Sequence, residues 1–298
     1  MNRMLGRIVL ISAGLIWGLG FIVNKYVLDQ GWNDSQLLFV RFFVATIFIF
    51  TFFHQRIFKY WKETIKPGFF LGIFLYLGFF FQTWGLVHTT ASNNALITAS
   101  YIFLMPFIIF VAEKKHVKKQ TIFAGILVVL GISLISVDFK ELTVASGDIL
   151  TFIGAFFYAF HIYFLGKMAK QKDPFVLMSF QLLIFCVFAF IMMMFRGGFP
   201  VVDFTQYSSL KVLLYASLMG FFGSFLGFVF QSVGQKHTHE AEAAILISTE
   251  SVFGPVLAIL FYNDPFNVYI LFGIIFVFIG IVLSEISLEN VYVKLKKK

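Results

Sequence analysis

Charged side chains inside apolar stretches are the residues of this chain best suited to chemistry. Glu250 lies near the middle of one such stretch, Arg41 a few residues into another, and Lys25 near the end of a third. A charge at the centre of a membrane helix costs ~2.5–3.5 kcal/mol on insertion scales, so such residues usually face the protein interior. We therefore expect Glu250 either to bind a coupling proton or a substrate ammonium group, or to join two helices through an ion pair or hydrogen bond.

Arg41 and Lys25 each allow more than one interpretation. The planar fork of donors on Arg41 suits a carboxylate, which could belong to a substrate or to Glu250. The same side chain could instead extend to the membrane interface. Lys25 could contact a substrate, or its long stem could carry the ammonium group to water. We take Glu250, Arg41 and Lys25 as the candidates for charge balance or proton coupling.

Two glutamines recur in the same local pattern. Gln82 lies between Gly78 and Gly85 at the spacing i, i+4, i+7, and Gln231 lies between two glycines at the same spacing. Each glutamine therefore shares a helical face with small residues. Close helix packing explains the glycines, but it does not explain a repeated amide on the same face. We expect Gln82 and Gln231 to line a substrate site.

Further polar or aromatic residues share helical faces with one another. Trp17 and Asn24 are seven residues apart, and Tyr158 and His161 are three apart. Aromatic residues in membrane helices usually serve packing, whereas Asn24 and His161 are rarer in lipid and are better candidates for binding. His161 could also titrate in the physiological range. Asn94, in a polar run that opens an apolar stretch, could point inward and completes the set of predicted substrate-binding residues.

Metal, cofactor and covalent chemistry find little support in the sequence. The single cysteine, Cys186, allows neither a disulfide framework nor a cysteine metal site. His237, His239, Glu240 and Glu242 lie close together, but no supporting set of ligands occurs elsewhere. No phosphate-binding glycine loop and no serine elbow is present. We expect no metal, no cofactor, no ATP-driven transport by this chain alone, and no enzymatic activity.

The composition shows in which environment these residues are positioned. Of 298 residues, 59% are hydrophobic and 13% are charged, against roughly 45–50% and about 25% in soluble domains. A soluble domain of this length would lack the polar surface to cover such a core, so lipid must be its solvent. The net charge of +8 resides in short connections, where it orients helices, so we expect no nucleic-acid partner. The first apolar stretch is interpreted as an uncleaved helix rather than a signal peptide.

Ten stretches satisfy the requirement of ~20 mostly apolar residues for a membrane span. Their connections are short and often carry turn residues, as at Gly31–Asp34, Lys66-Pro67, Asp173-Pro174, Gly197-Gly198 and Asn263–Pro265. No connection is long enough for a soluble domain. The predicted spans are Ile8–Leu28, Gln36–Phe53, Gly68–Val87, Ser92–Ala112, Thr121–Val137, Asp148–Met168, Phe175–Phe195, Val212–Gly234, Ala241–Tyr262 and Phe266–Ser284.

The distribution of Lys and Arg predicts the orientation. If the N-terminus is cytoplasmic, most basic residues of the connections lie inside, as the positive-inside rule requires. The outside connections then hold Lys140, Arg196 and Lys211, with Lys25 near a span end. An even number of spans with both termini inside gives this distribution. We expect a multi-pass protein of the cell (cytoplasmic) membrane, in contact with membrane lipid, with both termini cytoplasmic.

The second half of the chain repeats the first. At an offset of 149 residues (231 minus 82), Gln231–Thr238 lies over Gln82–Thr89, and Pro255 lies over Pro106. Each half holds five spans, so the second copy enters the membrane from the opposite side. We predict an all-α integral membrane protein of ten transmembrane helices in two inverted five-helix repeats, residues 1–142 and 143–298. Inverted repeats are typical of secondary transporters, whose substrate binds near the midplane between the halves.

These features resemble the EamA-type members of the drug/metabolite transporter superfamily over essentially the whole chain. The family's usual pattern has Pro directly after a Glu and a Gly-Glu pair further on, where this chain has Ser251 after Glu250 and then Asn263-Asp264. The resemblance implies ten helices, two inverted repeats and transport of small metabolites, often amino acids moving outward. The residues that carry it are Trp17-Gly18, Phe21, Thr89–Ser92, Gly125, Gly131, Glu250, Pro255 and Asn263-Asp264.

The sequence therefore predicts a secondary transporter that moves a small polar metabolite, an amino acid or a derivative, outward by alternating access. An integral membrane enzyme acting on a lipid or prenyl substrate is the alternative, although such enzymes normally cluster carboxylates or histidines at the membrane surface. A receptor or channel fits the inverted repeat less well. Gly223 and Gly227 form a Gly-x-x-x-Gly pair that could mediate a homodimer or could pack within a monomer.

Overall fold

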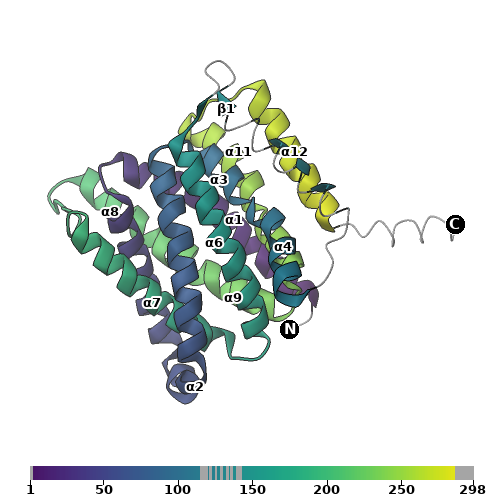
Figure 1. Ribbon diagram of the computed structural model, residues 1–298. Helices are drawn as coiled ribbons and strands as arrows, with labels where there is room; N and C mark the ends of the chain where they lie inside the picture. Colours follow the sequence, from purple (N-terminus) through teal and green to yellow (C-terminus); the bar gives the residue numbers. More distant parts are fainter. Residues whose placement is uncertain are drawn as a thin grey trace.

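The structure is a computed structural model of a helical bundle (Figure 1). It describes residues 3–114 and 143–285, together with positions 120, 123, 124, 126, 127, 130, 131, 134, 137 and 138. Residues 137–138 (β1) and 143–144 (β2) form a short antiparallel pair. The helices are α1 (Arg3–Asp29), α2 (Asp34–Val87), α3 (Ala91–Thr98), α4 (Tyr101–Glu113), α6 (Ser146–Ala169), α7 (Pro174–Phe195), α8 (Tyr207–Met219), the π-helix η1 (Gly220–Leu226), α9 (Gly227–Lys236), α10 (Glu240–Ile247), α11 (Glu250–Tyr262) and α12 (Val268–Glu285).

The predicted all-helical membrane class is confirmed. Seven helical stretches of the described residues are long and apolar enough to cross a membrane. Three of the ten predicted spans do not form separate helical stretches of spanning length here. Two of them, Gln36–Phe53 and Gly68–Val87, lie in the single helix α2, and the apolar helical part of a further one, Val268–Gly280, is short. The predicted span Thr121–Val137 and the predicted boundary at residue 142 lie largely outside the described residues.

Helix α2 differs most from the sequence prediction. It has 54 residues, about 80 Å at 1.5 Å per residue, which is more than twice the ~30 Å hydrocarbon core. The backbone of Phe53 is not helical (φ −119°, ψ 15°) and separates two helical stretches. The predicted break at Lys66-Pro67 is wrong, because Pro67 lies inside the helix. The carbonyl of Glu63, which loses its usual partner at Pro67, belongs to an exposed residue and can bind water.

Other predicted turns have the expected backbone. Gly31, Gly197 and Gly198 adopt positive φ angles, which glycine tolerates without strain. The carboxylate of Asp173 caps α7 by accepting from the amides of Phe175 and Val176, and Pro174 occupies the first turn. A proline there forgoes an N–H that has no helical partner.

Two long stretches are broken at corresponding positions. Helices α3 and α4 are separated at Ala99-Ser100, and α10 and α11 at Ser248-Thr249. The two breaks are 149 residues apart in the sequence (248 minus 99). The C-caps of α4 and α11, Lys114 and Asn263, are likewise 149 apart and share the left-handed conformation, with φ of 54° and 55°. The sequence offset thus coincides with matched backbone features.

Helices α1 and α6 cross the molecule in opposite directions. The start of α1 contacts the start of α10 through Arg7 and Glu242, whose Nε and Oε1 are 2.5 Å apart. The end of α6 contacts the same part of α10 through Lys170 and Glu240, with 2.7 Å between Nζ and Oε1. The start of α1 and the end of α6 therefore lie at one end of the bundle, which also holds the N-terminus in Figure 1.

Glycines allow close contacts around the centre of the bundle. A Cβ at Gly78 would lie 2.7 Å from the ring of Tyr158, and a Cβ at Gly227 would lie 2.6 Å from Nε1 of Trp17. A side chain at either position would therefore displace an aromatic ring that lines the centre. Gly223 is also buried within the chain, so the structure uses the Gly223–Gly227 pair for internal packing.

Candidate functional site

A cavity lined by both polar and apolar side chains lies at the centre of the bundle. The cavity volume is about 50 Å³, counted as the space that the centre of a water molecule can occupy. Because one water needs ~10–15 Å³ on this measure, the space suits a few waters or a small solute. The cavity is lined by Trp17, Gly20, Phe21, Asn24, Arg41, Leu75, Phe79, Gln82, Thr98, Tyr101, Tyr158, His161, Ile162, Met219, Phe228, Gln231, Ile247 and Glu250.

Most of the residues predicted for a site lie together in this cavity. They come from both halves of the chain, on α1, α2, α6, α9 and α11. The predicted residues at the cavity are Trp17, Asn24, Arg41, Gln82, Tyr158, His161, Gln231 and Glu250.

Asn94 and Lys25 do not line the cavity. Asn94 Nδ2 donates to the carbonyl of Gln82 at 3.0 Å and to Thr151 Oγ1 at 2.6 Å, which ties α3 to α2 and α6. Lys25 Nζ donates to the carbonyl of Leu86 at 3.2 Å and lies 3.3 Å from a carboxylate oxygen of Asp29. In this structure both side chains make contacts outside the cavity.

The two predicted glutamines have different environments. Gln82 Oε1 accepts from the Tyr158 hydroxyl at 2.8 Å, and Gln82 Nε2 donates to Thr98 Oγ1 at 2.9 Å. Gln231 Oε1 is buried and has no hydrogen-bond partner among the described residues. Gln82 therefore has partners on both atoms of its amide, while Gln231 offers an acceptor to whatever occupies the cavity.

Glu250 is the first residue of α11, directly after the break between α10 and α11. It is 5% exposed, and the Tyr101 hydroxyl donates to its Oε1 at 3.1 Å. Tyr101 is in turn the first residue of α4, after the matching break. The two positions differ by 149 residues. Sequence reasoning missed Tyr101, although this offset from Glu250 would have singled it out.

Arg41 is buried and carries its charge without a carboxylate beside it among the described residues. Its side chain is 1% exposed, so it does not extend to the interface. Nε and Nη1 have no hydrogen-bond partner. Its Cζ lies 5.3 Å from the ring centroid of Phe79 and 5.8 Å from that of Phe42. Aromatic rings at these distances attract a guanidinium but do not satisfy its N–H donors.

The remaining cavity residues divide into partnered and unpartnered groups. His161 Nε2 lies 2.9 Å from Gln181 Oε1, and Trp17 Nε1 donates to the carbonyl of Gly223 at 2.7 Å. Asn24 Oδ1 is buried without a partner in the part of the chain that the structure describes. Buried polar atoms are nearly always hydrogen-bonded, so the unpaired atoms of Asn24, Gln231 and Arg41 indicate a place for a polar ligand.

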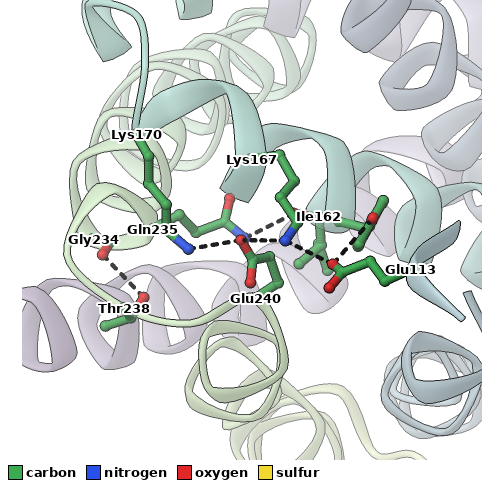
Figure 2. Close-up of polar contacts among 9 residues, drawn as sticks. Glu113, Ile162, Lys167, Lys170, Gly234, Gln235, Thr238 and Glu240 are labelled. Atoms are coloured by element: carbon green, nitrogen blue, oxygen red, sulfur yellow. Dashed lines mark hydrogen bonds and ion pairs between the residues drawn. The ribbon is translucent and has the colours of Figure 1, made fainter. Parts of the chain in front are cut away.

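A network of charges joins helices at one end of the bundle. Figure 2 shows Lys167 and Lys170, at the end of α6, beside Glu240 on α10 and Glu113 on α4. Lys170 Nζ donates to Glu240 Oε1 at 2.7 Å, and Lys167 Nζ lies 2.6 Å from Glu113 Oε1. A Cβ at Gly166 would lie 2.6 Å from Cγ of Glu240, so this glycine lets α10 approach α6. The network joins three helices from both halves of the chain.

The chain is similar to known proteins over almost its full length. The profile of the EamA-like transporter family matches residues 4–137 and 145–286. An uncharacterized transporter of Archaeoglobus fulgidus is 28% identical over 288 residues, which cover 96% of this chain and 87% of that protein. A protein of known crystal structure superposes with a TM-score of 0.69 at 11% identity, covering 94% of this chain and 97% of the other. This structural likeness concerns the fold alone.

Proposed function

The chain belongs to the EamA-like transporter family, and we propose that this membrane transporter moves a small polar metabolite, an amino acid or a derivative, through its central cavity by alternating access. The proposed direction is outward across the cytoplasmic membrane, as the resemblance implies. The observation that carries the proposal is a buried cavity, lined from both halves of the chain, in which Asn24, Arg41 and Gln231 hold unpaired polar atoms.

Two inverted repeats form part of the proposal. The family profile matches the chain in two segments, and α1 and α6 run in opposite directions. The helix breaks at Ala99-Ser100 and Ser248-Thr249 recur at the sequence offset of 149. An odd number of spans in each repeat would produce this inversion, and the kinked α2 is long enough for two spans. These observations support ten helices with the substrate between the halves.

The charge network of Lys167, Lys170, Glu113 and Glu240 is the proposed cytoplasmic gate. The pair between Lys167 of the second half and Glu113 of the first half joins the two halves, so they cannot separate at this end without breaking it. The basic residues at the same end support a cytoplasmic location under the positive-inside rule. Breaking the network would open the cavity to the cytoplasm and let the opposite end close.

Solute counterflow in proteoliposomes tests the proposal. Vesicles are loaded with an unlabelled amino acid or other small metabolite, and uptake of the labelled form is followed with purified protein. We expect transient accumulation of at least one solute, recovered chemically unchanged. Conversion of the solute, or of a lipid or prenyl compound in the vesicles, would favour the enzyme alternative. Absence of counterflow across the panel with folded protein would contradict the proposed substrate class.

A further inference from the structure

Arg41 is the buried group that the folded chain explains least. A guanidinium stays charged at any physiological pH, and burying a charge without a partner is strongly unfavourable. Among the described residues, Arg41 has no ion pair, and its Nε and Nη1 donors are unpaired. Glu250 lies in the same cavity, but the hydrogen bond to its carboxylate comes from Tyr101. A role as counter-charge to Glu250 therefore does not account for Arg41.

The surroundings hold the guanidinium in place without satisfying it. The rings of Phe42 and Phe79 lie near it. On another side, η1 comes close at its two glycines: a Cβ at Gly220 would lie 2.8 Å from the carbonyl oxygen of Arg41, and one at Gly223 would lie 3.5 Å from Nη2. A π-helix within a longer helix is often found at functional sites. Held in this way, Nε and Nη1 of Arg41 are buried with no hydrogen-bond acceptor among the described residues.

We propose that Arg41 binds the carboxylate of the transported solute and so determines its chemical class, an inference that rests on the proposed transport function. Arg41 is the one cation among the described residues that line the cavity, and an acidic residue, Glu250, shares it. A single positive charge suits a monoanion, whereas a phosphate ester carries about −1.5 to −2 charges at pH 7. A phosphate dianion would bring excess negative charge beside Glu250.

The same cavity also presents unpaired acceptors. Asn24 Oδ1 and Gln231 Oε1 need donors that the described residues do not supply. A solute with a carboxylate at one end and a hydroxyl or ammonium group elsewhere would satisfy both sets. The solute class is therefore a small monocarboxylate that carries hydrogen-bond donors of its own.

The test compares solutes that differ at the anionic group. Each carboxylate of the panel is measured beside its carboxamide and its phosphonate, both by counterflow and by the rise in melting temperature that it gives the detergent-purified protein. We expect the carboxamide to bind about 10- to 100-fold more weakly, as the loss of one charged hydrogen-bonded pair implies. Arg41→Gln should lose carboxylate affinity by about the same factor, and Arg41→Lys should retain part of it.

Two controls separate binding from folding. Arg56→Gln removes a half-exposed arginine whose Nη1 is 3.5 Å from Asp173, and it should leave carboxylate affinity unchanged. Arg41→Leu removes an unpaired buried charge, so the unliganded variant should melt at a higher temperature than the wild type while losing carboxylate binding. A lower melting temperature of this variant would indicate a structural role for Arg41 and overturn the proposal.

The remaining outcomes distinguish this inference from the proposed function. Arg41-dependent carboxylate binding without counterflow would support the site and contradict transport. Counterflow that is equal for carboxylate and carboxamide, or unchanged in Arg41→Gln, would support transport and overturn the role of Arg41. Tighter binding of the phosphonate than of the carboxylate would overturn the assignment to carboxylates. Absence of any Arg41-dependent binding would overturn it as well.

Discussion

Individual residues explain why the cavity could be predicted only in part. Polar residues are costly in lipid, so Asn24, Gln82 and Gln231 stood out in the sequence, and all three lie at the cavity. Which of their atoms are unpaired could not be predicted, because that depends on partners from other helices. Gln82 is paired with Tyr158 and Thr98, whereas Gln231 Oε1 is not.

The difference between the two glutamines leads to opposite expectations. Gln82→Ala leaves the Tyr158 hydroxyl and Thr98 without their partner and should destabilise the fold by about 1–3 kcal/mol. Gln231→Ala removes an unpaired acceptor and should keep the stability while raising the KM of transport about tenfold, through loss of one hydrogen bond to the solute. Chemical unfolding and counterflow kinetics measure the two effects. Equal loss of stability in both variants would show that Gln231 has a structural partner.

Substitution of Glu250 tests proton coupling at the scale of a single residue. Glu250→Gln keeps an amide oxygen that can accept from the Tyr101 hydroxyl, so the helix contact should survive. If Glu250 carries a coupling proton, the variant should lose the dependence of net transport on pH while still exchanging solute by counterflow. The initial rate of uptake between pH 5 and 8 measures this. Full transport with an unchanged pH profile would remove Glu250 from the coupling mechanism.

At the scale of elements, helix order was predictable and helix breaks were not. The stretches 92–112 and 241–262 satisfy the length and hydropathy of continuous spans, and neither break contains proline or glycine. The breaks at Ala99-Ser100 and Ser248-Thr249 bring Tyr101 and Glu250 to the starts of α4 and α11. The continuity of α2 through Pro67 was also missed, since a proline is normally a helix boundary.

The proposed gate gives a prediction at this scale. Glu113→Gln weakens the pair with Lys167, which joins the two halves, so the cytoplasmic end should open more often. With Cys186 replaced by Ser, a cysteine at Ile247 in the cavity reports the opening by its reaction with a membrane-impermeant thiol reagent. We expect labelling from the cytoplasmic side to become several-fold faster, and Arg56→Gln, which takes no part in the ion pairs of the network, to leave it unchanged. An unaltered rate in Glu113→Gln would exclude the gate role.

The pH range of the gate follows from the charges around Glu240. Burial alone would raise the pKa of Glu240, but the hydrogen bond from Lys170, a backbone hydrogen bond and the charges of Lys170 and Lys167 lower this pKa below the usual 4.5. A lowered pKa means that the ion pair stabilises the closed end above pH 4.5 and is lost as the pH falls through the lowered value. Between pH 5 and 8, Glu240→Gln should therefore leave the shape of the pH profile unchanged. A changed profile would show that Glu240 titrates in that range.

At the scale of the whole molecule, the membrane class followed from composition, because 59% hydrophobic residues cannot be covered by polar surface. Positions that are 149 residues apart in the sequence can lie in contact, as Tyr101 and Glu250 do. The central account is that one cavity is exposed alternately to the two sides of the membrane. It requires that the same lining residue be reached from both sides of one protein population.

The most direct test labels that cavity from each side in turn. The single cysteine at Ile247, in a background with Cys186 replaced by Ser, is treated with impermeant thiol reagent added outside right-side-out vesicles or inside-out vesicles. We expect labelling in both preparations, with prior reaction from one side removing the sites available from the other. Labelling from one side alone, unchanged when the gate is weakened by Glu113→Gln, would contradict alternating access through this cavity.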